Sequence, residues 1–173
     1  MNKSKQTLDI KRLGANRQPI ENIPECLNEE YLQNFILRGE NRLNANEDAI
    51  TFFKYGNWLD KTPKNHELLK KVINNFIPGA GPSGFFWYPT GAYMGWHTNA
   101  NRPGERFFCT YVEEGEKSFF RFRNPQDDKI YTEWEHKGWN FRRFRVGSKN
   151  TDILWHCVYS ETERFSFGFY LPS

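Results

Sequence analysis

A histidine and an asparagine stand two positions apart in the stretch GWHTNAN, just before a run of aromatic residues. A second histidine follows far along the chain, in the stretch LWHCV. Neutral imidazoles bind divalent transition metals, and a carboxylate two positions after the first histidine would complete a three-ligand site. The residue at that position is Asn99, whose amide oxygen can coordinate a cation but carries no charge. His97, Asn99 and His156 are therefore candidates for a metal site, and the residues alone leave open whether it is a full site, a weakened one or none.

The asparagine leaves three alternatives open at this site. Asn99, or a water in its place, acts as the third ligand; a carboxylate from Glu105 or Asp152 approaches instead; or the fold has lost the metal and kept only binding. Loss of a group that merely supports a ligand lowers metal affinity by about 10–100-fold. A neutral residue in the place of a charged ligand is expected to lower the affinity by at least as much.

An arginine and a serine share one strand face in RFSFGFYL, eight residues after the second histidine. The planar guanidinium of Arg164 matches a carboxylate with two parallel hydrogen bonds, and Ser166 can donate another. The alternative is a solvated strand-end arginine that pairs with Glu161 or Glu163. We favour a carboxylate-binding role because the aromatic run around Arg164 predicts burial.

The three cysteines, Cys26, Cys109 and Cys157, show no CxxC spacing. An odd number of unpaired thiols predicts a reducing, cytoplasmic setting. Cys157 adjoins His156, but neighbours on a strand point to opposite faces, so we do not expect a cysteine nucleophile.

Composition narrows the classes of partner. The chain of 173 residues has 24 Lys and Arg against 21 Asp and Glu, a net charge of +3. We do not expect nucleic-acid binding from so small an excess, although FFRFRN and NFRRFRV interleave arginine with aromatics as single-strand binders do. Mean hydropathy is −0.82, and no apolar run reaches the ~20 residues of a membrane span, so we expect no membrane contact.

The elements that must position these residues follow from the pattern of aromatic segments and turns. Aromatic residues make up 17% of the chain. Past residue 84, eight short segments alternate with turns such as NRPG, EEGE and GSKN, which predicts a mainly β protein with N-terminal helices, a double-stranded β-helix or jelly roll. The expected strands are 85–89, 92–98, 106–112, 117–123, 129–135, 139–146, 152–158 and 164–171.

The first part of the chain predicts supporting elements. Apolar spacing indicates helices over 24–37 and 62–79, and AITFFKYGNW (49–58) is typical of a strand. We expect a polar tail or arm over 1–20. Residues 21–173 are expected to form a single jelly-roll domain, with the two helices on the outside of one sheet.

Strand alternation makes a further prediction about the cavity. Gly95, His97 and Asn99 should face one way and Met94, Trp96 and Thr98 the other. Trp96, Trp155 and Tyr93 are candidates for the cavity wall or, equally, for the core.

The stretch 85–171 resembles the iron(II)- and 2-oxoglutarate-dependent oxygenases, through YPTGAYMGWHTNAN and WHCVYSETERFSFGF. It is most similar to the prolyl-hydroxylase-like branch and to small oxygenases of phage and marine microbes. The resemblance implies Fe(II) on His97, Asn99 and His156, with His97 and His156 as the catalytic residues. It also implies 2-oxoglutarate held by Arg164 with Ser166 and Tyr88, and O₂ as the oxidant.

The resemblance therefore implies an Fe(II)/2-oxoglutarate oxygenase, a hydroxylase acting on a small molecule or peptide that the sequence does not identify. Asn99 departs from the family's carboxylate. The alternatives are a catalytically impaired jelly-roll binding module and a cupin-like protein that uses another divalent metal. We expect neither halogenation, because Asn is not small, nor base demethylation, because RFSFGFY lacks the arginine-rich ending of those relatives. Specificity is expected in the loops 79–84, 100–105 and 124–130.

Overall fold

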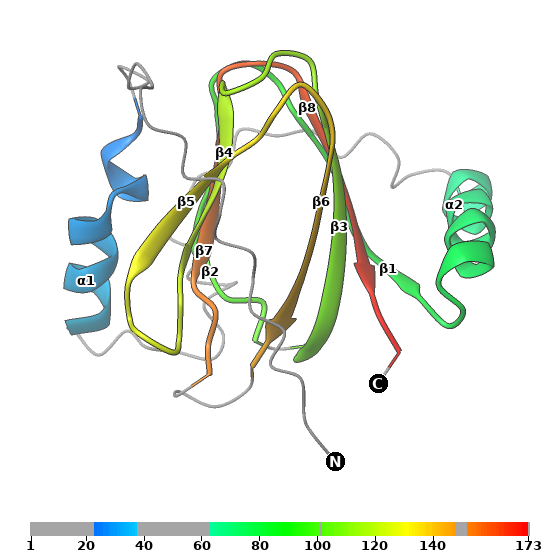
Figure 1. Cartoon of the computed structure of the whole chain (residues 1–173), viewed down its shortest axis with the longest axis horizontal. Helices are drawn as coiled ribbons and strands as arrows, with labels where there is room; N and C mark the ends of the chain where they lie inside the picture. Colours follow the sequence, from blue (N-terminus) through cyan, green and yellow to red (C-terminus); the bar gives the residue numbers. More distant parts are fainter. Residues whose placement is uncertain (1–22, 38–62, 101, 148–151, 173) are drawn as a thin grey trace.

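Eight strands form two four-stranded antiparallel sheets that face each other, the arrangement of a jelly roll (Figure 1). The structure is a computed structural model that describes residues 23–37, 63–100, 102–147 and 152–172. The predicted fold class, mainly β with N-terminal helices, is confirmed. The predicted tail over 1–20 and the predicted strand over 49–58 lie outside the described residues.

Successive strands alternate between the two sheets, except for β4 and β5, which are neighbours in one sheet. One has the order β1-β8-β3-β6 and the other β2-β7-β4-β5. The strands are β1 (Gly81–Tyr88), β2 (Ala92–His97), β3 (Gly104–Val112), β4 (Ser118–Arg123), β5 (Ile130–Trp134), β6 (Gly138–Val146), β7 (His156–Ser160) and β8 (Arg164–Tyr170).

The strand pairs describe one long hairpin coiled on itself. β4 pairs with β5, β3 with β6, β2 with β7 and β1 with β8, so the first half of the β region runs antiparallel to the second half. Two further pairings, β3 with β8 and β4 with β7, close the two sheets. This coiling brings β2 next to β7, although they are far apart in sequence.

Aromatic side chains fill the space between the sheets because alternate strand residues point inward. On β4, Phe120 and Phe122 belong to the cluster between the sheets, whereas Phe119 belongs to a second cluster on the outer face. The inner cluster consists of Tyr88, Ala92, Phe120, Phe122, Phe144, Val146, Leu154 and Val158.

A helical segment covers the outer face of the β2-β7-β4-β5 sheet (Figure 1). It comprises the 3₁₀-helix η1 (Glu25–Leu27) and α1 (Glu29–Leu37). The side-chain oxygen of Asn28 accepts a hydrogen bond from the backbone N–H of Tyr31, which caps the start of α1. Leu27 and Leu32, both 0% exposed, pack against the outer aromatic cluster.

The second helix, α2 (Pro63–Phe76), lies beside β1 of the other sheet (Figure 1). The prediction that both helices support one sheet is therefore wrong. The outer face of the β2-β7-β4-β5 sheet is apolar and is already covered by α1, whereas α2 leaves Leu68, Val72 and Phe76 exposed. Within the described residues, no helix is both long and apolar enough to span a lipid bilayer.

Candidate functional site

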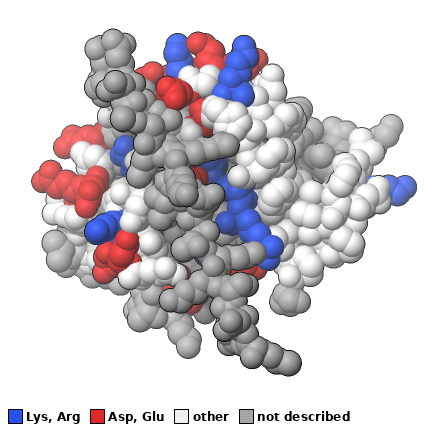
Figure 2. Space-filling model, viewed as in Figure 1, with Lys and Arg blue, Asp and Glu red and all other residues white. Residues whose placement is uncertain are grey.

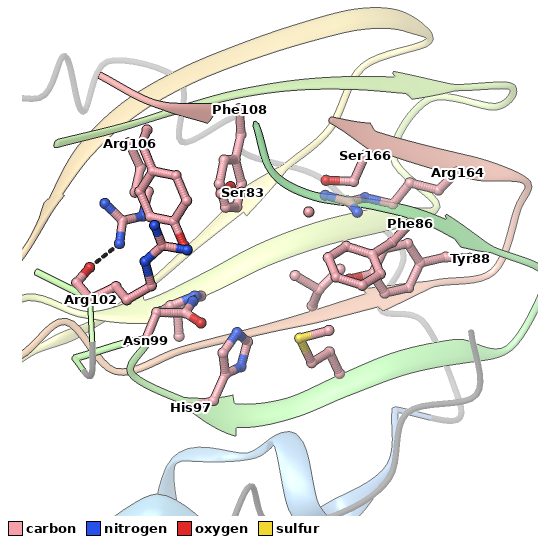
Figure 3. Close-up of a pocket in the computed structure, with 15 residues that line it drawn as sticks. Ser83, Phe86, Tyr88, His97, Asn99, Arg102, Arg106, Phe108, Arg164 and Ser166 are labelled. Atoms are coloured by element: carbon pink, nitrogen blue, oxygen red, sulfur yellow. Dashed lines mark hydrogen bonds between the residues drawn. The ribbon is translucent and has the colours of Figure 1, made fainter. Parts of the chain in front are cut away.

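A cavity of about 250 Å³ opens between the two sheets (Figure 3). All six residues predicted for metal and 2-oxoglutarate binding line it, and they come from β1, β2, β7, β8 and the segment after β2. The sequence did not single out Arg102, Arg106 or Tyr170, which also line it. The six predicted residues are Tyr88, His97, Asn99, His156, Arg164 and Ser166.

The two histidines meet because they are direct partners across the β2–β7 pair. Their ring centroids are 4.1 Å apart. The Nδ1 of His97 lies 2.8 Å from the carbonyl oxygen of Gly95, and the Nδ1 of His156 lies 3.0 Å from that of Leu154. Nδ1 must therefore carry the proton and donate it, so each Nε2 carries a lone pair rather than a hydrogen.

Burial keeps both imidazoles neutral. It lowers the pKa of His97 to about 4, despite the opposing hydrogen bond to Gly95. For His156, burial and then the neighbouring His97 hold the pKa well below its usual range. The ring of Phe120 stacks on His156 with centroids 5.3 Å apart, which contributes to the apolar surroundings. Neutral imidazole is the form that coordinates a metal.

Asn99 adjoins the histidine pair but turns its amide nitrogen toward it. The Asn99 Nδ2 donates to the Nε2 of His156 at 3.1 Å. Its φ of 55° is in the left-handed region, which asparagine adopts more readily than most residues. Rotation of the amide would exchange nitrogen for oxygen and present Oδ1 to a cation. The three donors fit a divalent metal in type, but together they carry no charge.

The two carboxylates considered as substitutes do not line the cavity. Glu105 pairs with Arg143 at 3.1 Å and reaches Arg145 at 4.0 Å. Asp152 is exposed. Among the described residues, no three or more His, Cys, Asp and Glu side chains cluster as a metal site would require.

A bulge in β2 changes which residues face the cavity. The register of β2 against β7 shifts between Met94 and His97, so both line the cavity. Simple alternation had placed them on opposite faces, and that prediction is wrong. Trp96, Trp155 and Tyr93 belong to or pack against the outer cluster under α1, so they are core residues rather than cavity walls.

Arg164 is buried and bound to a partner that the sequence did not identify. Its Nε and Nη2 donate to the two carboxylate oxygens of Glu135 at 2.6 and 2.8 Å. Glu161 and Glu163 instead accept hydrogen bonds from Tyr159 and Trp87. The solvated alternative for Arg164 is wrong, because its exposure is 1%.

Glu135 is the centre of a buried polar network just after β5. It also accepts hydrogen bonds from Thr110, Ser118 and Arg142. Burial alone would raise the pKa of Glu135, but Arg164 and Arg142 outweigh it and hold the pKa well below the usual range. A buried arginine requires a counter-charge, which is a sequence signal for such a partner, although it does not say which acidic residue supplies it.

The network leaves one nitrogen of Arg164 for a ligand. Its Nη1 is buried and has no hydrogen-bond partner among the described residues. Ser166 lines the same cavity wall, and the ring of Tyr88 lies 4.9 Å from the Arg164 Cζ. A carboxylate there would meet one guanidinium nitrogen and a serine hydroxyl, rather than the two-pronged fork expected from the sequence.

Two further arginines, Arg102 and Arg106, stack on Tyr170. Their Cζ atoms lie 4.1 and 4.0 Å from the centroid of its ring. Arg106 and Tyr170 are direct partners across the β3–β8 pair. The cavity therefore has basic groups both here and at Arg164, and Figure 3 shows His97 between them.

Outside the cavity, Cys157 and Arg121 have structural roles. Cys157 packs in the outer cluster, on the opposite face from His156. Arg121 donates to the Leu27 carbonyl at 2.7 Å and thereby ties β4 to η1.

On the face seen in Figure 2, basic and acidic side chains are interspersed apart from one basic run near its centre. The absence of nucleic-acid binding stays a prediction.

No protein-family model and no curated protein matches the chain. Similar solved structures include a prolyl-4-hydroxylase from Pseudomonas putida, with 17% identity and a TM-score of 0.41 over 79% of this chain and 85% of that one. The Drosophila melanogaster CENP-C cupin domain has 8% identity and a TM-score of 0.34 over 50% and 57%. The Schizosaccharomyces pombe Cnp3 cupin domain has 12% identity and a TM-score of 0.32 over 55% of each chain. The chain thus spans little more than half the length of these cupin domains. These likenesses are too distant to assign an activity, and the strand pairing itself establishes the jelly roll.

Proposed function

We propose that the chain is an Fe(II)- and 2-oxoglutarate-dependent oxygenase that hydroxylates its substrate. The observation that carries the proposal is the buried, neutral pair His97–His156, with Asn99 beside it and Arg164 in the same cavity. Both rings are fixed through Nδ1 by backbone carbonyls, as metal-ligating histidines generally are. The motifs around the pair resemble those of this oxygenase family.

In this proposal, His97, His156 and the amide oxygen of Asn99 hold Fe(II). The Nη1 of Arg164 and the hydroxyl of Ser166 bind the distal carboxylate of 2-oxoglutarate. When bound, Fe(II) supplies the reaction in which O₂ and 2-oxoglutarate convert a substrate C–H to C–OH, with release of succinate and CO₂.

The chain's own contribution is orientation and exclusion of water. Glu135 holds Arg164 in place before any ligand arrives, so little freedom is lost when a carboxylate binds. Met94, Phe108 and Val158 give the cavity apolar walls, which strengthen each charge–charge contact inside it. Asn99 has to rotate its amide away from donating to His156 before it can offer oxygen.

The charge of the cavity implies that metal and co-substrate bind together. Three arginines line it, and no carboxylate does among the described lining residues. Of these three arginines, only Arg164 has an acidic partner within the described residues, so a divalent cation alone would meet neutral ligands and net positive charge. The keto acid brings the negative charge that the chain does not supply at position 99.

Anaerobic addition of Fe(II) and 2-oxoglutarate tests the proposal. We expect the visible charge-transfer absorption of an Fe(II)–keto acid chelate, and release of succinate once O₂ is admitted. His97→Ala and His156→Ala should abolish both signals. His136→Ala is the matched control, because His136 is exposed in the turn before β6. Equal signals from the three variants would refute the proposal.

A second candidate is a metal-free module that binds an organic anion. The hydrogen bond from Asn99 to His156 favours it, because that bond occupies the lone pair a metal would need. The basic lining of the cavity favours it as well. A rise in melting temperature with 2-oxoglutarate in the presence of a chelator, without any succinate, would identify this module. Metal analysis of the purified protein would reveal a cupin-like use of another divalent ion.

A further inference from the structure

We propose that Arg102 and Arg106 bind an oxyanion, a carboxylate or phosphate group, on the primary substrate. The inference rests on the proposed function in one respect: it assigns 2-oxoglutarate to Arg164, which leaves the other basic pair for the molecule that is oxidised. The substrate is then an organic anion rather than a neutral compound.

The two guanidinium groups are arranged by a shared aromatic ring. Arg106 faces Tyr170 across the β3–β8 pair, and Arg102 comes from the segment just before β3. The Cζ atoms of Arg102 and Arg106 lie 4.1 and 4.0 Å from the centroid of the Tyr170 ring, within stacking distance. Stacking fixes the planes of the guanidiniums and leaves their N–H edges to meet an oxyanion, with which arginine forms paired hydrogen bonds.

No acidic side chain in the described part of the chain neutralises the positive charge of this pair. Arg106 is 3% exposed, yet the hydrogen bonds that it makes to described residues go to the backbone carbonyls of Glu105 and Arg102. Neither arginine has an acidic partner among the described residues. Burial first, and the nearby Arg102 as well, lower the pKa of Arg106. Burial of a cation without a counter-ion costs free energy, and an anionic ligand would lower that cost.

Other arginines on the same sheet do have acidic partners. Arg143 and Arg145, on the exposed side of β6, have Glu105 as their acidic partner. Arg164, at the other end of the cavity, has Glu135. Arg102 and Arg106 are therefore the cavity arginines for which an external anion would supply the counter-charge.

The positions of these arginines would keep the substrate anion and 2-oxoglutarate at opposite ends of the cavity. Arg102 is exposed and marks the mouth of the cavity, whereas Arg164 is 1% exposed and marks its floor. In Figure 3, His97 lies between these two ends, and Asn99 lies beside Arg102. A substrate anchored at the mouth would place its body over the apolar side chains of Phe86 and Phe108, next to the histidine pair.

Fluorine NMR titration of the full chain tests the inference with three small probes. They are 4-fluorobenzoate, 4-fluorophenyl phosphate and the neutral 4-fluorobenzamide, each added with saturating 2-oxoglutarate and diamagnetic Zn(II). We expect at least one anionic probe to bind and the amide not to bind. Comparison of the two anions tells a carboxylate substrate from a phosphate one.

Three variants locate the anion. Arg102→Gln and Arg106→Gln should each weaken binding by about tenfold or more, the effect of removing one charged hydrogen-bond donor. Arg145→Gln makes the same change of charge on the outer surface and should leave binding unchanged. Arg102 is exposed, so its variant keeps the test valid even if Arg106→Gln does not fold.

The outcomes separate this inference from the proposed function. Equal binding of the amide, an equal loss in Arg145→Gln, or displacement of the anion by 2-oxoglutarate would overturn the substrate assignment even if succinate forms. Arginine-dependent binding of the anion without any succinate would uphold the anion site and reject the oxygenase.

Discussion

At position 99, an amide stands where the proposed metal site would otherwise have a charged ligand. The left-handed backbone at Asn99 would accept aspartate equally well, since both residues tolerate positive φ. The histidines, their backbone anchors and their burial need no change for a carboxylate to replace the amide. Position 99 is therefore a site where a single substitution should change binding without disturbing the fold.

We predict that Asn99→Asp raises affinity for Fe(II) or Mn(II) by at least about tenfold, because a charged oxygen replaces a neutral one. The substitution also removes the N–H that occupies His156. Isothermal titration of the purified protein with Mn(II) measures the change, and Asn99→Ala serves as the control that removes the amide without adding charge. An unchanged affinity would mean that residue 99 does not contact the metal.

Glu135 holds two arginines by one carboxylate, and the chain is expected to depend on it for stability. We predict that Glu135→Gln lowers the free energy of unfolding by about 3–5 kcal/mol, the usual cost of leaving a buried charge without its partner. Urea denaturation measures it. Glu133→Gln, which affects a half-exposed pair with Arg142, should cost about 1 kcal/mol or less.

The same carboxylate predicts a pH dependence. Its pKa in the folded protein lies well below the ordinary value near 4.3. The stabilisation is therefore complete above about pH 4.3 and is lost as the pH falls below it, because the unfolded state then binds the proton more readily. The difference in unfolding free energy between wild type and Glu135→Gln should shrink on acidification below that pH. A difference that stays constant down to pH 3 would contradict the role assigned to Glu135.

At the scale of elements, the sheet that carries the histidines is supported from outside by α1. Leu27 and Leu32 pack on the faces of β2, β4 and β7 that point away from the cavity. The α2 helix lies against β1 instead, and its apolar side chains Leu68, Val72 and Phe76 are exposed. The two helices should thus contribute unequally to stability.

We predict that Leu32→Ala lowers the free energy of unfolding by about 2–5 kcal/mol, since it opens a cavity in the outer cluster. Leu68→Ala on α2, where the side chain is 60% exposed, should stay within about 0.5 kcal/mol of wild type. Chemical denaturation of the two variants makes the comparison. A large loss in Leu68→Ala would show that α2 packs more closely in solution than the structure has it.

For the molecule as a whole, the positive charge of the cavity should couple the binding of the two proposed ligands, the divalent metal and 2-oxoglutarate. A keto acid that lowers the cost of binding a cation must by the same free energy be bound more tightly when the cation is present. We predict that Mn(II) and 2-oxoglutarate together raise the melting temperature by more than the sum of their separate effects. Differential scanning fluorimetry at constant ionic strength measures this. Purely additive shifts would contradict the coupling.

The sequence by itself determined the jelly roll and the candidate ligands. Short aromatic segments between turns can bury their side chains only in facing sheets. The family resemblance of the motifs around His97, Asn99 and His156 identified three residues that the structure places in one cavity. The position of Arg164 and Ser166 on one strand face followed from the period of two residues. These features depend on local periodicity, which the order of residues contains.

Tertiary structure alone decided the rest. The bulge that turns Met94 toward the cavity arises from pairing with β7, and no local sequence pattern in β2 predicts it. The choice of Glu135 rather than Glu161 or Glu163 as the partner of Arg164 depends on which strands the coiled hairpin brings together. The stacking of Arg106 on Tyr170 likewise requires the β3–β8 pair. Such contacts depend on distances between remote segments, and only the folded chain sets those distances.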